Sequence, residues 1–171
     1  MVSTAPNPKW KEKMDITYEE YFNAPIYIPH KGIILLTKIL EDALGKEEAH
    51  RRIQKKVEEI YRDATHRSRA NKPVEGFKDF QSRWANISTP LMQRVLEAEI
   101  LESTLKVHRM RVHKCLFAET FRSMGESELG YIWECNNDSV MAEESDPRVR
   151  MVRTKTLMQG DDCCWTWKED E

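Results

Sequence analysis

The sequence predicts an α+β protein in which N-terminal helices pack against a small antiparallel β-sheet formed mainly by the C-terminal third of the chain. Apolar residues recur at helical spacing through most of the first half. Beyond residue 100 the pattern changes to short β-prone segments separated by turns. The 171 residues suffice for one hydrophobic core, so we expect a flexible arm over residues 1–16 and a single domain over residues 17–171.

Three helical regions are predicted before residue 70. A short helix should begin at Thr17 and end at Pro25 and Pro29, because proline lacks the N–H donor that a helix interior needs. A second helical pattern covers residues 31–44. The third pattern is the clearest and covers residues 46–66, where charged pairs at i,i+4 spacing flank one apolar stripe.

The next region changes from helix to strand. Phe77, Phe80 and Trp84 share one stripe of a further helix, which we interpret mainly as core packing, with the wall of a ligand pocket as the alternative. Residues 91–101 fit either a helix or a strand. Residues 104–112 contain β-branched residues with a partial period of two and are predicted to form a strand.

The C-terminal region is predicted to contain one more helix and a hairpin. The helix covers residues 114–124, and residues 131–133 form a short β-prone or buried segment that ends in a turn at 135–138. Residues 148–157 and 163–167 read as the two strands of a hairpin with a four-residue turn.

The charge balance argues against two classes of partner. Lys and Arg total 27 and Asp and Glu total 29, which gives a net charge of −2. Such a chain has no general attraction to nucleic acid or to anionic membranes. No apolar run approaches the ~20 residues of a membrane helix, and residues 1–14 lack an apolar run of signal-peptide length. We therefore expect a cytoplasmic protein whose four cysteines are thiols.

The common nucleotide-binding, esterase and metalloprotease motifs are absent, and we predict neither a cofactor nor a metal. The candidate chemical groups lie in the last third of the chain. Cys115 begins a predicted helix, whose dipole can lower the pKa of a thiol. Cys135 lies in a predicted turn, three residues before Asp138. If Arg153 faces the helices from its strand, it must meet a carboxylate from the protein or from a ligand.

Each of these groups also has a purely structural interpretation. A buried free cysteine is commonly a small hydrophobe. Arg153 or Thr154 could be an ordinary surface residue of the strand, and Asp161 and Asp162 could serve only to form the turn.

The segment RTKTLMQGDDCC, from Arg153 to Cys164, resembles the C-terminal signature of the L-2-amino-thiazoline-4-carboxylic acid hydrolase family. The pieces of the family pattern that precede it occur in the same order, and they are Cys115, Phe121, Met124-Gly125, Leu129-Gly130 and Cys135-x-x-Asp138. The chain departs from the family where Trp165-Thr166 replaces Asp-Phe. The family cysteine is Cys164 by its spacing from the glycine, or Cys163 by strand face.

This resemblance implies hydrolytic ring opening of a small heterocycle, in which water adds to the amidine-like carbon of a 2-aminothiazoline carboxylate and yields an N-carbamoyl amino acid. The reaction needs a cation for the carboxylate, and either a base for water or an attacking thiolate. The candidate catalytic residues are Cys135, Asp138, Asp162 and Cys164. The candidate substrate-binding residues are Arg153, Thr154, Asp161, Cys115 and Trp165. Thiolate attack and activated water both remain open.

Two other functions are compatible with the sequence. The same pocket could serve a cyclase or isomerase of a biosynthetic pathway, with tryptophans stacked on a flat intermediate. The chain could also be a non-catalytic domain that senses a ligand or a metal. A small-molecule substrate is the expected partner of either enzyme, and the exposed edge of the hairpin could support a homodimer.

Overall fold

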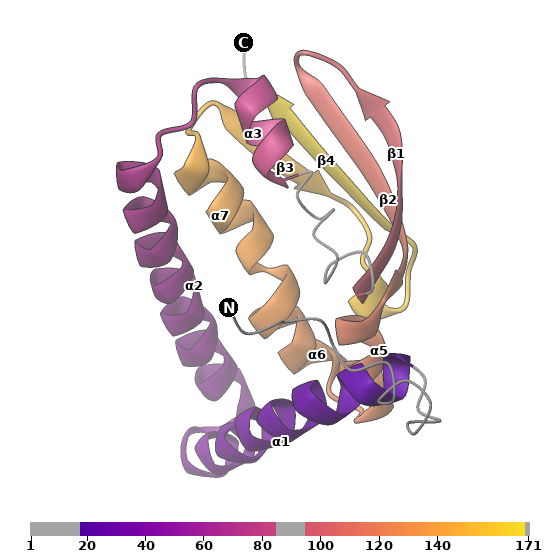
Figure 1. The fold of residues 1–171 in the computed structure, drawn as a ribbon. Coiled ribbons are helices and arrows are strands. Elements are labelled where there is room, and N and C mark those ends of the chain that lie inside the picture. Colours follow the sequence, from indigo (N-terminus) through magenta and orange to yellow (C-terminus); the bar gives the residue numbers. More distant parts are fainter. Residues whose placement is uncertain (1–17, 85–94, 170–171) are drawn as a thin grey trace, which may run out of the picture.

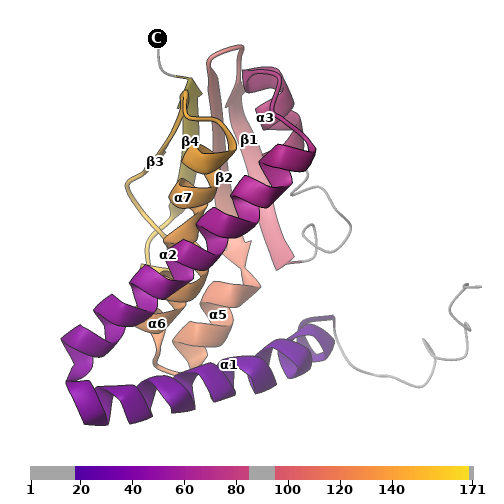
Figure 2. The same ribbon diagram turned by 90° about the vertical axis from the view of Figure 1, so that its left-hand side faces the viewer.

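Helices and one sheet form separate layers. A computed structural model describes residues 18–84 and 95–169. Helix α7 (Asn137–Ser145) lies between helix α2 (Lys46–Asn71) and the sheet, and helix α1 (Tyr18–Leu44) crosses the lower end of the molecule (Figure 1). Figure 2 shows the same order from the side, with α2 in front of α7 and the sheet behind them. The predicted α+β fold class is confirmed.

The sheet contains four antiparallel strands in the order β1-β2-β4-β3. These strands are β1 (Leu96–Ser103), β2 (Val107–Cys115), β3 (Val149–Arg153) and β4 (Cys163–Glu169). β3 and β4 pair from Val149 opposite Glu169 to Arg153 opposite Trp165. Strand β4 also pairs with β2, so β1 and β3 are the edge strands.

Helix α1 is continuous through Pro25 and Pro29, so the predicted break at these prolines is wrong. Each proline removes one i→i−4 hydrogen bond, but helix formation is cooperative and the turns on both sides continue. The predicted end of the helix at residue 44 is confirmed. Gly45 adopts a φ of 80°, and its N–H donates to the Glu41 carbonyl at 2.8 Å. Glycine adopts this φ without the steric penalty of a Cβ, so the chain can turn there from α1 into α2.

The remaining helical elements are α3 (Phe77–Trp84), α5 (Leu116–Ser123), α6 (Ser127–Gly130), the π-helix η3 (Tyr131–Cys135) and the 3₁₀ turn η4 (Leu157–Gln159). They contribute to two groups of buried side chains. Phe77 and Phe80 belong to the group beside the sheet, which confirms the predicted core role of this aromatic stripe. Phe121 and Met158 belong to the second group, at α5, α6 and η4. The side chain of Trp84 lies outside the described residues.

The middle of the chain contains more helix than the sequence predicted. For residues 131–133 the buried alternative is confirmed by Ile132 and the β-prone one is wrong, and the turn at 135–138 is also wrong, because these residues form η3 and the start of α7. Strand propensity depends strongly on context, and packing against neighbouring elements overrides it here. The strand predicted over 104–112 is shifted to 107–115. Residues 91–101 were compatible with either a helix or a strand. Residues from Leu96 onward form a strand, and residues 91–94 lie outside the described part of the chain.

The predicted C-terminal hairpin is present, but its connection is longer than four residues. β3 ends at Arg153, and residues 154–162 lead through η4 to β4. The Thr156 hydroxyl accepts the N–H of Met158 at 3.2 Å, and Gly160 adopts a φ of 98°. These two local features replace the last residues of the predicted strand with a tight 3₁₀ turn.

The predicted arm over residues 1–16 lies outside the described residues, so the single domain beginning at residue 17 stays a prediction. Among the described helices, not one combines the length and the apolar character that crossing a bilayer requires.

Candidate functional site

A buried ion pair joins α7 to the end of β3. Arg153, the last residue of β3, donates through Nη2 to Oδ2 of Asp138 in the first turn of α7. Its Nη1 donates to the backbone carbonyl of Cys135 at 2.7 Å. The side chains of Arg153 and Asp138 are 9% and 14% exposed. Arg153 thus meets a carboxylate of the protein itself, as the burial of a guanidinium requires.

The π-helix η3 places Cys135 next to this pair. The N–H of Asn136 reaches back five residues to the carbonyl of Tyr131 at 2.9 Å, which is the π-helical pattern. Gly130 precedes η3 at a close approach, because a Cβ at this position would lie 2.6 Å from Cγ of Phe121. Only glycine therefore allows η3 to follow α6 so tightly against α5. Short π-helical turns occur frequently at functional sites.

The thiol of Cys135 is protonated at neutral pH. Burial raises the pKa of Cys135 to about 12, although the neighbouring Arg153 guanidinium opposes the shift. The Sγ atom lies 3.8 Å from Oγ1 of Thr156, which is buried at the start of η4. Cys115 occupies the N-cap position of α5 and packs, with Cys135, against the second core group. Cys135 is therefore a weakly acidic thiol and not a ready thiolate.

The Asp138 carboxylate is a stronger base than an exposed aspartate. Burial raises the pKa of Asp138, Arg153 opposes the shift, and the Glu134 carboxylate adds to it. A carboxylate with a raised pKa accepts a proton more readily near neutral pH. Strongly perturbed groups of this kind cluster at functional sites.

Two residues from the N-terminal helices complete this region, and no sequence pattern groups them with it. His30 of α1 is buried, with Nε2 3.4 Å from Oε1 of Glu134 and its ring centroid 4.4 Å from that of Phe121. Tyr61 of α2 has a raised pKa, caused by burial and by the carboxylates of Glu134 and Asp138. We refer to the whole set as the interior cluster, which consists of His30, Tyr61, Glu134, Cys135, Asp138 and Arg153.

The buried polar atoms without a hydrogen-bond partner among the described residues include Nδ1 of His30, Nε1 of Trp133 and Oδ1 of Asn137. An unsatisfied buried polar atom is costly in free energy. These atoms comprise one donor, one acceptor and one imidazole nitrogen.

A comparison with known families identifies the family of this chain. A model of the L-2-amino-thiazoline-4-carboxylic acid hydrolase family matches residues 27–167. The chain belongs to this family. The match includes both His30 and Arg153, so the whole interior cluster lies within the family region.

No curated protein matches the sequence. A solved structure, the phenol-responsive sensory domain of the transcription activator PoxR with phenol, is similar to this member of the family with a TM-score of 0.46 and 10% sequence identity. The similarity covers 81% of this chain and 73% of that chain. This level of likeness is too low to assign a function.

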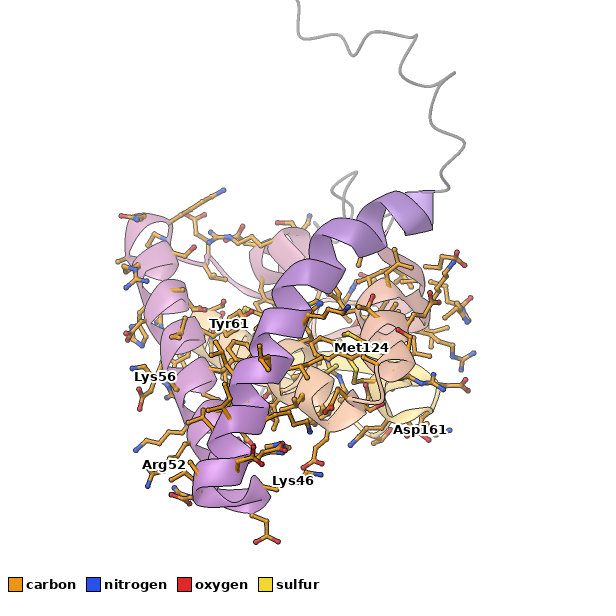
Figure 3. The ribbon with its side chains drawn as sticks, turned by 90° about the horizontal axis from the view of Figure 1, so that it is seen from below. Lys46, Arg52, Lys56, Tyr61, Met124 and Asp161 are labelled. Carbon is orange, nitrogen blue, oxygen red and sulfur yellow. The ribbon has the colours of Figure 1, made fainter. Side chains whose placement is uncertain are left out.

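The other residues of the family signature lie in different surroundings. Thr154 is exposed, whereas Thr156 of the same motif is buried beside Cys135. Asp161 and Asp162 are exposed in the connection before β4, and Figure 3 shows Asp161 at the rim of the molecule, well apart from Tyr61. The structure does not bring these two carboxylates into the buried cluster, because the longer connection keeps them in water.

The two adjacent cysteines lie on β4. The register pairs Cys163 with buried Val112 and Cys164 with exposed Arg111. The side chains of both cysteines and of Trp165 lie outside the described residues. Their assignment as family cysteine or substrate contact therefore stays a prediction.

Within the described residues, the side chains of His, Cys, Asp and Glu form no group of three that could hold a metal ion. Two surface hollows formed by described residues lie elsewhere. One is at the turn between α1 and α2, and the other lies between α2 and α3.

Proposed function

We propose that the protein is a hydrolase-like enzyme that opens a small cyclic amidine, similar to an aminothiazoline carboxylate. The observation that carries this proposal is the buried Asp138–Arg153 pair beside Cys135, in a chain that belongs to this hydrolase family. A base with a raised pKa next to a buried cation suits the activation of water for attack on a polarised carbon.

The proposed reaction adds one water molecule to the substrate. Asp138 takes a proton from water as the water oxygen forms a bond to the C=N carbon, and Asp138 then passes this proton to the ring nitrogen. The bond from this carbon to the ring sulfur then breaks, and the sulfur leaves with the second proton of water. The product is an open-chain N-carbamoyl thiol.

Arg153 has two functions in this proposal. It holds Asp138 and the end of η3 in place through two of its five N–H donors. The guanidinium charge also attracts the substrate carboxylate, so that substrate and Asp138 meet at one cation. Asp138 and the substrate then compete for the same charge, which makes Asp138 more basic as the carboxylate enters.

Activated water is favoured over attack by Cys135. A thiol with a pKa of about 12 has very little thiolate near neutral pH, and the thiolate is the nucleophile. Cys135 is therefore assigned the role of shaping the site through Thr156 and the Arg153 contact.

The test is turnover of 2-aminothiazoline-4-carboxylate by the full chain, with the N-carbamoyl product measured by mass spectrometry. Asp138→Asn should reduce kcat by about 10²-fold or more, the usual loss of a general base. Cys135→Ala should retain most of the activity. Asp146→Asn is the matched control, because Asp146 is also a buried aspartate paired with an arginine, at 2.6 Å from Arg148.

Two results would contradict the proposal. One is a wild-type chain that leaves the compound unchanged. The other is an Asp138→Asn variant that folds, by circular dichroism, and turns over at the wild-type rate. A variant Cys135→Ala without activity would instead favour thiolate attack.

A further inference from the structure

Helix α1 has a polar inner face and an apolar outer face. On the inner side, His30 and Thr37 are buried and Glu41 is largely covered. Five large aliphatic side chains point to solvent and are 39–64% exposed, namely Leu35, Leu36, Ile39, Leu40 and Leu44. A surface helix normally buries its apolar stripe, so this arrangement is inverted. Figure 3 shows α1 nearest the viewer, and no element of the described chain lies beyond it.

Polar contacts hold α1 in this orientation. His30 is anchored at Glu134, as described above. Lys38 Nζ lies 3.2 Å from Oε1 of Glu126, and Glu41 Oε1 lies 2.7 Å from Nε2 of His50. The other ring nitrogen of His50 lies 2.9 Å from Oε1 of Glu128, which also lies near Lys46. We refer to Lys38, Glu41, Lys46, His50, Glu126 and Glu128 as the corner cluster. Rolling α1 to bury its leucines would break both this cluster and the His30 contact.

The outer face has the spacing of a helix–helix seam. Gly32, Leu36, Ile39 and Ala43 follow one another at intervals of four, three and four residues, as the central positions of a heptad pattern do. Gly32 and Ala43 are exposed, and a Cβ at Gly32 would meet nothing within 4 Å. Small residues at both ends and branched residues in the middle let two such helices approach closely.

We propose that a second copy of this chain covers this face, with the two α1 helices packed antiparallel about a two-fold axis. In this arrangement Leu36 packs against the partner's Ile39, and Gly32 faces the partner's Ala43. A two-fold contact uses the same patch on both copies, so each of these residue pairs occurs twice across the seam. Exposed apolar patches of this kind mark interaction sites.

Charge at the ends of the seam favours the antiparallel arrangement. Lys31 and Asp42 are both exposed and lie at opposite ends of the seam. Antiparallel packing brings Lys31 near the partner's Asp42 at both ends, whereas parallel packing brings like charges together.

The α1 face is a better candidate than the β1 edge of the sheet for this contact. Edge strand β1 carries Glu97, Glu99 and Glu102. Two copies of β1 pairing edge to edge would place these carboxylates close together, and charged residues on an edge strand prevent such pairing. The α1 seam carries no charged residue at its four central positions.

Sedimentation velocity on the full chain tests the proposal. The wild type should sediment as a dimer with twice the chain mass of 20.2 kDa. Leu36→Glu should place two carboxylates in the seam and raise the dimer dissociation constant by about 100-fold or more. Leu105→Glu is the matched control, because Leu105 is 77% exposed at the β1–β2 turn, far from α1. This control should remain dimeric, and circular dichroism should show both variants folded.

A charge exchange tests the antiparallel register. Lys31→Asp and Asp42→Lys should each weaken the dimer by about 2–5-fold, as exposed ion pairs do, and the double variant should restore it. A monomeric wild type overturns the proposal. So does a Leu36→Glu chain that stays dimeric, a Leu105→Glu chain that dissociates, or a double charge variant no stronger than the single ones.

Discussion

The interior cluster and the corner cluster use the same kinds of side chain but differ in their access to water. Each combines a histidine, carboxylates and at least one long cation. In the corner cluster, the hydrogen bond from Lys46 is the main reason why the pKa of Glu128 is lowered. Burial opposes the shift at Glu41, yet hydrogen bonds from His50 and Lys38 lower the pKa of Glu41 overall. Ion pairing therefore dominates at the corner.

In the interior cluster, loss of water dominates. Burial raises the pKa of both Asp138 and Cys135, even though Arg153 lies beside both groups. The same pairing of charges thus stabilises ions at the corner and only partly compensates for desolvation in the interior. Acid–base chemistry requires a group whose pKa is shifted by desolvation, as in the interior cluster. A helix corner that is held in place requires stable ion pairs, as in the corner cluster.

The largest expected effect is the loss of Arg153. Arg153→Met leaves the Asp138 carboxylate buried without its cation and should lower the free energy of unfolding by about 3–5 kcal/mol. Chemical denaturation followed by circular dichroism measures this change. Arg51→Met is the matched control, since Arg51 is exposed and pairs with Glu48 at the surface, and its effect should be much smaller.

The double variant Asp138→Asn/Arg153→Met sharpens this result. Removal of both charges should recover much of the stability lost in Arg153→Met, because the cost comes from the unpaired buried charge. Equal losses in the single and double variants would mean that desolvation does not distinguish the interior from the corner.

The second effect concerns the reactivity of Cys135. Its pKa of about 12 implies a thiolate fraction roughly a thousandfold below that of an ordinary cysteine. Iodoacetamide at pH 8 should therefore label Cys135 about a thousandfold more slowly in the folded protein than in the unfolded protein. Peptide mapping by mass spectrometry follows the label at each cysteine.

An introduced surface thiol provides the control for this experiment. Ser68→Cys places a cysteine at an exposed position of α2, and this thiol should react at the ordinary rate. Rapid labelling of Cys135 in the folded chain would contradict the desolvated interior and would reopen thiolate attack.

The chemistry of the interior cluster was only partly accessible from the sequence. Cys135, Asp138 and Arg153 could be named as candidates because they fall in a short segment that resembles one family. The prediction that Arg153 needs a carboxylate followed from burial alone. The roles of these residues in a reaction stay predictions.

His30 and Tyr61 could not be placed from the sequence. His30 stands between a proline and a lysine without a recognisable pattern. Tyr61 lies on the apolar stripe of α2 and looks like a core residue. Their approach to Glu134, about 104 residues beyond His30, depends on how α1 and α2 pack, which no local pattern records.

The wrong prediction of a β-prone segment at residues 131–133 also results from packing that no local pattern records. Tyr131, Ile132 and Trp133 are β-prone residues, but the close approach of Gly130 to Phe121 fixes a helical course for them. In contrast, α2 and the β3–β4 pair were predictable, because their apolar periodicity and turn residues specify them locally.

The third effect is a difference in the sign of the pH dependence of stability. The pKa of Glu41 is lowered from 4.5, so the unfolded chain binds more protons and the stabilisation is lost as the pH falls below about 4.5. The pKa of Asp138 is raised from 3.8, so the folded chain binds more protons and stability declines as the pH rises above 3.8.

Two variants separate these contributions. Glu41→Gln should cost about 1 kcal/mol at pH 7 and flatten the loss of stability in acid. Asp138→Asn should remove the decline above pH 3.8. Unfolding free energies measured from pH 3 to pH 8 give both slopes, and slopes of the same sign would contradict the contrast between the two clusters.

The smallest effect is expected at Asp162, a carboxylate outside both clusters. Its side chain is exposed in the connection between η4 and β4, where water solvates the ion fully. Asp162→Asn should change the free energy of unfolding by less than about 0.5 kcal/mol, as most surface substitutions do. Turnover of the aminothiazoline compound should also be unchanged, in contrast to Asp138→Asn. If Asp162→Asn instead abolishes turnover in a folded chain, an exposed carboxylate performs the chemistry. Burial would then not be the property that separates the reactive region from the structural one.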